Sequence, residues 1–246
     1  MAEASLAETI SRLPNVSATI AETLANMIFA GKLRPGQRLI QTKLAEDFGV
    51  SRLPVRDALH LLEQRSLVVT RPRKGVVVRP VTRQAVRDIF AVRAALEPLA
   101  LSEIIDRLDP EDLSAMEEIV SRQEEAVLAG DMAASFSLDQ RFHASLHSHT
   151  QNHSLREMLQ IVWDRNRQIR SVTQVSDRGR DIGEKSVARH RQLLEALRER
   201  DPERARAIIV RTIAISEQEI LGELERLGWI ENEDGEVSKG LEDQAR

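Results

Sequence analysis

The chain has 246 residues with a formal net charge of −4, and 41% of the residues are hydrophobic, which is enough to bury a core. It contains no Cys, so disulfides, thiolate metal sites and thiol nucleophiles are excluded. Only 3% of the residues are aromatic and none is Tyr, which argues against base-stacking platforms for single-stranded nucleic acid.

Charge is divided unevenly along the chain. Residues 1–80 contain 12 Lys and Arg against 7 Asp and Glu, whereas the rest of the chain contains 23 against 32. A basic segment on an acidic remainder is expected when one part of a protein meets a polyanion, and chance fluctuation is the alternative. No apolar run approaches the roughly 18 to 20 residues of a membrane span, and the first residues lack the basic and apolar regions of a signal peptide. We therefore expect a cytoplasmic protein with no membrane partner.

A small domain is expected at 15–80, after a flexible lead-in at 1–14. The predicted helix N-caps in this domain are Ser17, Thr42 and Ser51. The first two helices are expected to end at Gly31 and Gly49, and the third at about Gln64. Two β-branched runs then flank the basic turn RPRKG, which is typical of a β-hairpin. Three helices followed by a hairpin predict a winged helix-turn-helix.

The third of these helices carries a basic face. Arg52, Arg56 and His60 are spaced i, i+4 and i+8, so they share one side of the helix. A separate apolar stripe is formed by Val55, Leu59 and Leu62. The major groove admits one helix, and Arg binds the O6 and N7 atoms of guanine there. The basic residues of the hairpin are suited to an adjacent groove or to phosphates: Arg71, Arg73, Lys74 and Gly75. The alternative is an ordinary solvated basic face.

From Thr82 onward the pattern is helical, with about six helices of 18 to 25 residues and no strand, which predicts an all-α bundle at 82–230. The expected breaks are Asp109-Pro110, Gly130-Asp131, 150–152, 176–183 and Asp201-Pro202. In three of these breaks an Asp lies where an N-cap is needed. The polar, acidic tail at 231–246 is expected to be disordered.

The bundle has a candidate metal site. Asp139 and His143 are spaced i, i+4, so their side chains converge, and His190 falls in an apolar stripe of a later helix. One carboxylate and two imidazoles suit a divalent transition metal, although Asp139 and His190 could instead form a hydrogen-bonded core pair. Three further histidines are expected to be a solvated group at a helix end and not ligands: His147, His149 and His153.

Arginine is suited to holding the carboxylate of an effector molecule. Arg93 and Arg165 are the candidates in the helical part of the chain. For Arg93 the alternative is a simple surface pair with Glu97, which lies four residues later.

The run GKLRPGQRLIQTKLAEDFGVSRLPVRDALHLLEQRSLVVTRPRKGVVVRPV resembles the winged-helix domain of the GntR family of bacterial transcription regulators. The helical remainder resembles the FCD effector domain of the FadR-type subclass. The resemblance implies that Arg52 and Arg56 read bases, that Thr42 and Ser51 touch backbone or bases, and that the hairpin reaches the minor groove. Two residues depart from the family pattern. Leu53 stands where Thr is usual, and Ser66 where Gly is usual.

The resemblance also implies a metal held by an Asp and three histidines. Asp139, His143 and His190 match the first three ligands, whereas Thr212 stands at the position of the fourth. Thr is a poor ligand for zinc or nickel, so zinc, nickel or manganese would keep three protein ligands, and Thr212 would face the effector.

The function expected from the sequence is a homodimeric repressor that binds a short palindrome in double-stranded DNA and responds to a small carboxylate. One alternative keeps the DNA-binding role with a metal-free pocket for an acyl-CoA-type ligand. Another, from a different class, is a metal-dependent hydrolase or lyase, but no general base or nucleophile accompanies the cluster, so we do not expect an enzyme.

Overall fold

The computed structural model describes residues 15–171, 174 and 176–231, and the chain divides into two compact units. Of the described residues, the first unit contains those within 15–82 and 229–231, and the second contains those within 83–228. The lead-in expected at 1–14 and the tail expected from 232 onward lie outside the described residues.

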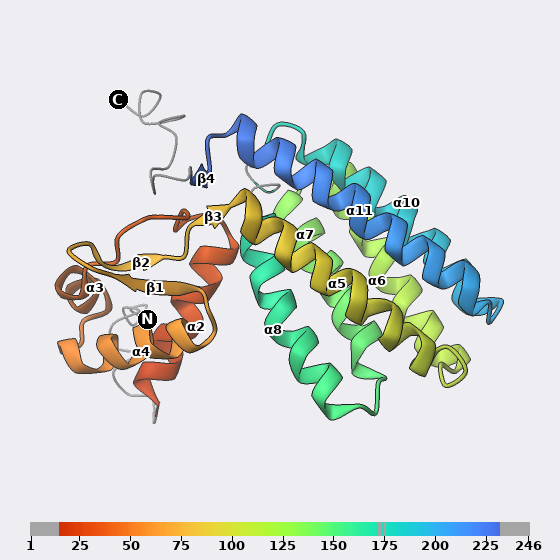
Figure 1. Ribbon diagram of the computed structural model, residues 1–246, viewed down its shortest axis with the longest axis horizontal. Helices are drawn as coiled ribbons and strands as arrows, with labels where there is room; N and C mark the ends of the chain where they lie inside the picture. Colours follow the sequence, from red (N-terminus) through yellow and green to blue (C-terminus); the bar gives the residue numbers. More distant parts are fainter. Residues whose placement is uncertain (1–14, 172–173, 175, 232–246) are drawn as a thin grey trace, which may run out of the picture. The chain divides into compact units, whose positions relative to one another are not determined.

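The first unit is a winged helix-turn-helix, as predicted. Its helices are α2 (Val16–Phe29), α3 (Gln41–Phe48) and α4 (Arg52–Gln64), followed by strands β1 (Val68–Arg71) and β2 (Gly75–Val78). The strands form an antiparallel hairpin in which Val68 pairs with Val78 and Arg71 with Gly75 (Figure 1). The helices pack because apolar residues recur at helical spacing, and these side chains are fully buried: Ile20, Leu24 and Ile28 in α2, and Val55, Leu59 and Leu62 in α4.

Two of the predicted helix starts in this unit are wrong. The N-cap of α2 is Asn15 rather than Ser17, and its Oδ1 accepts a hydrogen bond from the Ala18 amide at 3.1 Å. Helix α3 begins at Gln41, so Thr42 lies inside its first turn. Ser51 does occupy the N-cap position of α4, although its side chain makes no capping hydrogen bond.

A second pair of strands was not expected. Strand β3 (Val81–Thr82) pairs in parallel with β4 (Ile230–Glu231), the segment that follows the last helix. Two residues are too few to produce the alternating pattern by which a strand is recognised in sequence. The pairing joins the two places where the chain passes between the units, at residues 82–83 and 228–229.

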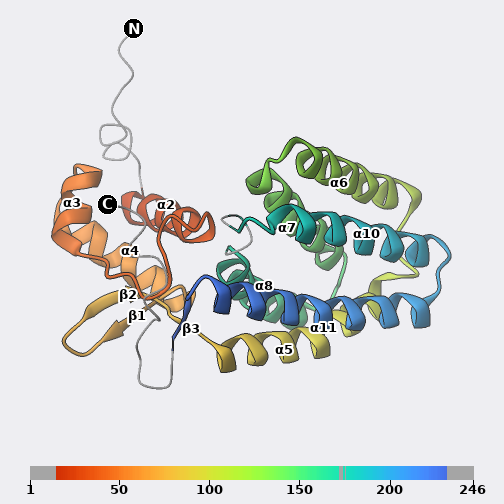
Figure 2. The same ribbon diagram turned by 90° about the horizontal axis from the view of Figure 1, so that it is seen from above.

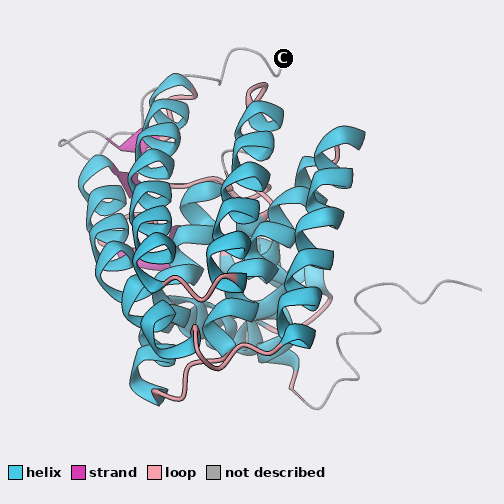
Figure 3. Ribbon diagram, turned by 90° about the vertical axis from the view of Figure 1, so that its right-hand side faces the viewer, coloured by secondary structure: helices cyan, strands magenta, loops and turns pink. Residues whose placement is uncertain are grey.

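The second unit is an all-α bundle, as predicted (Figure 3). Its described helices are α5 (Arg83–Ile104), α6 (Pro110–Ala129), α7 (Met132–Ser148), α8 (His153–Arg170), α10 (Gly179–Arg198) and α11 (Pro202–Arg226). Helices α5 and α11 lie side by side, and so do α6 and α10 (Figure 2). The predicted N-caps Asp109, Asp131 and Asp201 are confirmed, because each carboxylate accepts a backbone N–H three residues later.

The break expected at 176–183 is too long, because α10 begins at Gly179 and Gly183 lies within it. Gly183 is a packing residue rather than a helix breaker. A Cβ atom at this position would stand 2.9 Å from a methyl group of Val127 on α6, so α6 and α10 approach closely there.

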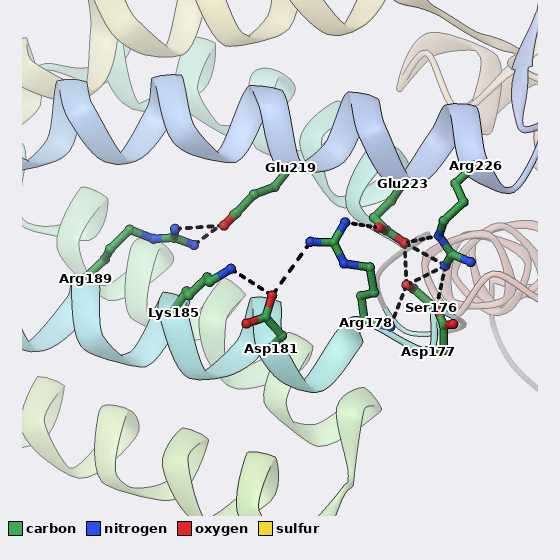
Figure 4. Close-up of polar contacts among 9 residues, drawn as sticks. All are labelled: Ser176, Asp177, Arg178, Asp181, Lys185, Arg189, Glu219, Glu223 and Arg226. Atoms are coloured by element: carbon green, nitrogen blue, oxygen red, sulfur yellow. Dashed lines mark hydrogen bonds and ion pairs between the residues drawn. The ribbon is translucent and has the colours of Figure 1, made fainter.

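A polar network joins the end of α11 to the segment before α10 (Figure 4). Glu223 is fully buried and accepts hydrogen bonds from Ser176, from Arg178 at 3.1 Å and from Arg226 at 2.8 Å. Arg226 also forms an ion pair with Asp177 at 2.6 Å. A buried carboxylate with three donors fixes the last turn of the helix that leads back to the first unit.

Candidate functional sites

The basic face predicted on α4 is exposed in the structure. Ser51, Arg52, Arg56 and His60 all lie at the surface, and so does Thr42 on α3. The side chain of Arg56 is 67% exposed, and its ion pair with the adjacent Asp57, at 3.7 Å, is also exposed. Such a pair restrains an arginine weakly. The guanidinium groups of α4 are therefore available to an external partner.

The hairpin presents a second basic surface. Arg73, Lys74 and Gly75 are exposed in the turn between β1 and β2, whereas Arg71 is half-buried at the end of β1. The turn uses left-handed backbone at two positions, with φ of 63° at Arg73 and 72° at Gly75. A helix start and a basic hairpin tip in one small unit match the requirements for reading a groove and holding phosphates.

The second unit contains a cluster of buried polar side chains around Asp139, whose carboxylate is held by several hydrogen bonds. Its Oδ1 accepts hydrogen bonds from Ser186 at 2.7 Å and from Arg170 at 3.2 Å. Its Oδ2 accepts from Gln140 at 3.2 Å and forms an ion pair with Arg170 at 3.1 Å. Burial raises the pKa of Asp139, but the charge of Arg170, the neighbouring His190 and the hydrogen bond from Ser186 together hold that pKa below its ordinary value. Asp139 is therefore a buried, ionised partner of Arg170.

His143 and His190 meet beside this carboxylate. Their Nε2 atoms are 3.3 Å apart, and the Nδ1 of His190 lies 2.9 Å from Oε1 of Gln123 on α6. His190 Nε2 is 3.7 Å from Asp139 Oδ1. Burial lowers the pKa of His143 well below its ordinary value and that of His190 to about 4, so both rings are neutral near pH 7. The structure thus brings together the three predicted ligands.

Arg93 lies in the same cluster. It is 1% exposed, so the surface pair considered for Arg93 and Glu97 is wrong. Its guanidinium donates to Glu97 Oε1 at 2.6 Å and to Asn166 at 3.1 Å, and it lies over the ring of Trp163. Burying an arginine requires such compensation from a carboxylate, an amide and an aromatic face.

The prediction that His147 is solvated is also wrong. Its side chain is 7% exposed, and the ring of Trp163 on α8 lies beside it at a centroid distance of 5.7 Å. Burial lowers its pKa as well. The other two histidines of that stretch lie away from the cluster: His149 is 3.0 Å from Asp112, and His153 contacts Arg156.

Two groups in the cluster have the donor atoms and spacing of a metal site. One is Asp139, His143 and His190, and the other is Glu97, His143 and His147. In each group the potential ligand atoms lie within 4.8 Å of one another. Sequence reasoning did not include Glu97 and His147 in a candidate ligand group, and it missed Gln123 and Arg170 as neighbours of the cluster. A useful signal was present, since His147 is four residues from His143 on α7.

Two hollows open near these helices. A cavity of about 330 Å³ between α7 and α8 is lined by His147 and Trp163 and by three arginines: Arg141, Arg156 and Arg167. A groove of about 630 Å³ between α10 and α11 is lined by residues that include Thr212, Arg211 and Ile215, and by none of the ligand groups. The predicted effector residue Arg165 lines neither hollow, and it is buried with a hydrogen bond to Gln168.

The chain matches two family models. The model described as "Bacterial regulatory proteins, gntR family" covers residues 16–78, and the FCD domain model covers residues 88–214. The HTH-type transcriptional regulator YdhC of Bacillus subtilis is 33% identical over 184 residues, which span 74% of this chain and 81% of that protein. The repressor RspR of Escherichia coli is 26% identical over 176 residues, which span 69% of this chain and 73% of RspR.

Solved structures of similar fold include McbR/YncC of E. coli, with a TM-score of 0.74 and 24% identity over 84% of this chain and 97% of that one. A GntR regulator of Rhodococcus has a TM-score of 0.72 and 25% identity, again over 84% of this chain and 97% of that one. Among the described residues, no helix is both long and apolar enough to span a membrane.

Proposed function

The chain belongs to the GntR family of bacterial regulatory proteins and carries an FCD domain, and from this premise we propose that a small carboxylate bound in its helical unit controls its binding to operator DNA. It is a DNA-binding transcriptional regulator, and its relatives are regulators rather than enzymes. RspR is described as a repressor, which supports repression as the direction of control. A regulator of bacterial genes works in the cytoplasm, where the DNA lies.

For DNA, we propose that Arg52 and Arg56 read base edges in the major groove while Thr42, Ser51 and His60 position α4. Because Ser51 makes no capping bond, the first N–H groups of α4 are suited to a phosphate. The basic hairpin tip at Arg73 and Lys74, with Arg71 and Gly75 beside it, contacts the neighbouring backbone or minor groove. Each bidentate contact between Arg and guanine contributes about 1–3 kcal/mol of discrimination between bases.

A homodimer accounts for a palindromic operator, because each protomer then supplies one reading helix. Four large apolar side chains are exposed on two helices that pack together: Val92 and Leu99 on α5, and Met158 and Ile161 on α8. Their exposed fractions run from 42% to 61%. Exposed apolar side chains on adjoining helices are suited to a protein interface, and a second copy of this chain is the partner we propose.

For the effector, the observation that carries the proposal is the cavity between α7 and α8. Three arginines line it, and His147 and Trp163 form its border with the buried cluster. Arginines are suited to carboxylates, and the volume of about 330 Å³ is that of a small-molecule site. The three imidazoles and two carboxylates of the cluster also suit a divalent transition metal such as zinc, nickel or manganese, which would bind a carboxylate oxygen directly.

Control of DNA binding requires the effector to favour one arrangement of the protein over another. The test is DNA binding by the purified chain on a selected palindromic site, with mono-, di- and tricarboxylates added in turn. We expect one class of carboxylate to release the DNA and to raise the melting temperature of the protein. If every carboxylate left both quantities unchanged, the proposal would fail.

An acyl-CoA-type ligand is a second candidate, favoured by the larger groove between α10 and α11. Its lining combines the apolar Ala207, Ile208 and Ile215 with the cationic Arg211 and Lys185. Adding long-chain acyl-CoA to the same assay separates the candidates. Release of DNA by acyl-CoA, and not by carboxylates, would identify this groove as the effector site.

A further inference from the structure

Leu53 is the large apolar side chain most exposed to solvent in the described part of the first unit. Its exposed fraction is 57%, against 48% for Ile40 and 36% for Leu61. Leu53 belongs neither to the core of this unit nor to the side chains packed against it, although α4 supplies four residues to that core: Val55, Ala58, Leu59 and Leu62. A single exposed Leu is ordinary on a protein surface. Its position on α4 therefore decides whether Leu53 has a role.

Leu53 is the second residue of α4, after Arg52 and the N-cap residue Ser51. In a helix the Cα–Cβ bonds tilt toward the N-terminus, so a side chain covers the turn that precedes its own residue. No turn of α4 precedes Leu53, so its side chain extends toward the N-terminal end of the helix. Arg56 follows three residues later and is its neighbour on the helix surface. Leu53 therefore lies among the arginines that we propose to read bases.

The other two exposed apolar side chains are placed differently. Leu61 lies two turns further along α4, and Ile40 precedes α3, the helix before the reading helix. In a helix-turn-helix, the N-terminal residues of the second helix contact base edges, whereas the first helix crosses the DNA backbone. Of these three side chains, only Leu53 is at the position that meets base edges.

An apolar side chain and an arginine recognise different features of a base pair. Arginine binds the acceptor atoms of guanine, whereas the feature of the major groove that suits an apolar side chain is the C5-methyl group of thymine. The family pattern has Thr at this position, and Thr offers both a methyl group and a hydroxyl group that pairs with several bases. Leu53 keeps the apolar contact and lacks the hydroxyl group. A polar base edge covered by Leu53 would lose water without gaining a hydrogen bond, which costs free energy.

We propose that Leu53 selects thymine at one position of each half-site by packing against its C5-methyl group in the major groove. This inference rests on the proposed function, since it requires α4 to lie in that groove. It adds an apolar contact to the recognition of guanine by Arg52 and Arg56. The operator should therefore contain a thymine whose methyl group, rather than its hydrogen-bonding atoms, is needed for tight binding.

The test removes the methyl group from the DNA and the side chain from the protein. The preferred site of the full-length chain is first selected from random double-stranded DNA. Each dT of that site is then replaced in turn by deoxyuridine, which pairs with adenine in the same way but lacks the methyl group. Fluorescence anisotropy with the wild type should show one thymine per half-site whose replacement weakens binding about fourfold, the loss expected when one methyl group is no longer buried.

The protein variants show which residue the methyl group contacts. Leu53→Ala should bind the thymine site more weakly than the wild type does, and it should bind the thymine and uracil sites equally. The matched control is Leu61→Ala, which shortens another exposed leucine of the same helix and should keep the wild-type preference for thymine. Selection with Leu53→Thr should yield a site in which that thymine is no longer required. Circular dichroism checks that all three variants fold.

An undiminished preference for thymine over uracil in Leu53→Ala would overturn the proposal, because the methyl group would then contact another residue. A wild type that tolerates every replacement by deoxyuridine would overturn it as well. Arg56→Ala separates this failure from failure of the proposed function. If Arg56→Ala loses discrimination at a guanine while Leu53→Ala changes nothing, α4 reads the groove without Leu53. If neither variant changes base preference, the assignment of α4 to the groove fails together with the proposal.

Discussion

On α4 the arginines stand in solvent with weak restraint, whereas in the helical unit Arg93 and Arg170 are buried and held by carboxylates and amides. The difference follows from the partner each region meets. A surface that reads DNA must exchange water for phosphates and base edges, so its charged side chains are not held by strong ion pairs within the protein. A buried cluster has no water to exchange, so each charge needs a permanent counterpart. Substitutions should therefore affect binding in the first region and folding stability in the second.

The largest effect is expected for Arg170→Met, which tests the contrast between the buried and exposed arginines. Asp139 would remain buried without its counterion, and loss of one partner of a buried pair costs about 3–5 kcal/mol. Urea unfolding of the metal-free protein measures this loss as a reduced free energy of unfolding.

The matched control is Arg191→Met, which removes an ion pair with Glu124 whose side chains are 45% and 46% exposed. This exposed pair should contribute less than about 1 kcal/mol. Similar losses in the two variants would show that burial does not distinguish these ion pairs.

A pH titration tests the buried cluster without mutation. Burial lowers the pKa of His190 to about 4, whereas histidine in an unfolded chain titrates at about 6.5. Between these values the unfolded chain binds a proton that the folded chain excludes. The free energy of unfolding therefore rises with pH across this window and levels off above it. Going from pH 7 to pH 5 should remove about 2 kcal/mol of stability through His190. His143 and His147 act in the same direction, since burial lowers both of their pKa values.

Urea unfolding with a metal chelator, at pH 7 and at pH 5, measures this effect. His190→Gln removes the titrating ring, so its stability should depend less on pH than that of the wild type. An identical dependence in both proteins would mean that His190 is not the group responsible.

On the exposed face of α4, a substitution is expected to change the affinity for operator DNA. Arg56→Ala should weaken operator binding by about 1–3 kcal/mol and relax the choice of base at one position. The free energy of unfolding should stay within about 0.5 kcal/mol of wild type, because Arg56 is largely exposed. Fluorescence anisotropy with operator and with mutated operators measures both consequences.

Lys74→Ala on the hairpin is the variant to compare with Arg56→Ala. It should weaken binding to all sequences alike and lower the slope of log affinity against log salt by about one. An unchanged salt slope would remove the phosphate contact assigned to the hairpin tip.

The two regions also differ in how far they follow from sequence. The face of α4 is visible because Arg52, Arg56 and His60 lie within nine residues of one helix, where spacing alone fixes a shared side. The hairpin follows in the same way, from two β-branched runs around one turn. Local patterns suffice where a site is built from adjacent residues.

The buried cluster draws on five helices. Asp139 and His143 are predictable as an i, i+4 pair, but Glu97 on α5, Gln123 on α6 and Arg170 on α8 reach them only through packing. No local pattern shows that helices more than 20 residues apart converge. The burial of His147 was not predicted for the same reason, since its packing against Trp163 involves another helix.

The smallest effect concerns the turn that joins the two parts of the reading surface. Ser66 lies between α4 and β1 with φ of 58°, where the family pattern has Gly. Left-handed backbone costs a residue with a Cβ about 1–2 kcal/mol, and part of this is offset because Gly loses more entropy on folding. Ser66→Gly should therefore raise the free energy of unfolding of the first unit by roughly 0.5–1 kcal/mol. The bond of 2.7 Å from Arg79 to the Ser66 carbonyl is retained, so operator affinity should not change. Altered affinity with unaltered stability would show instead that Ser66 sets the placement of the hairpin against α4.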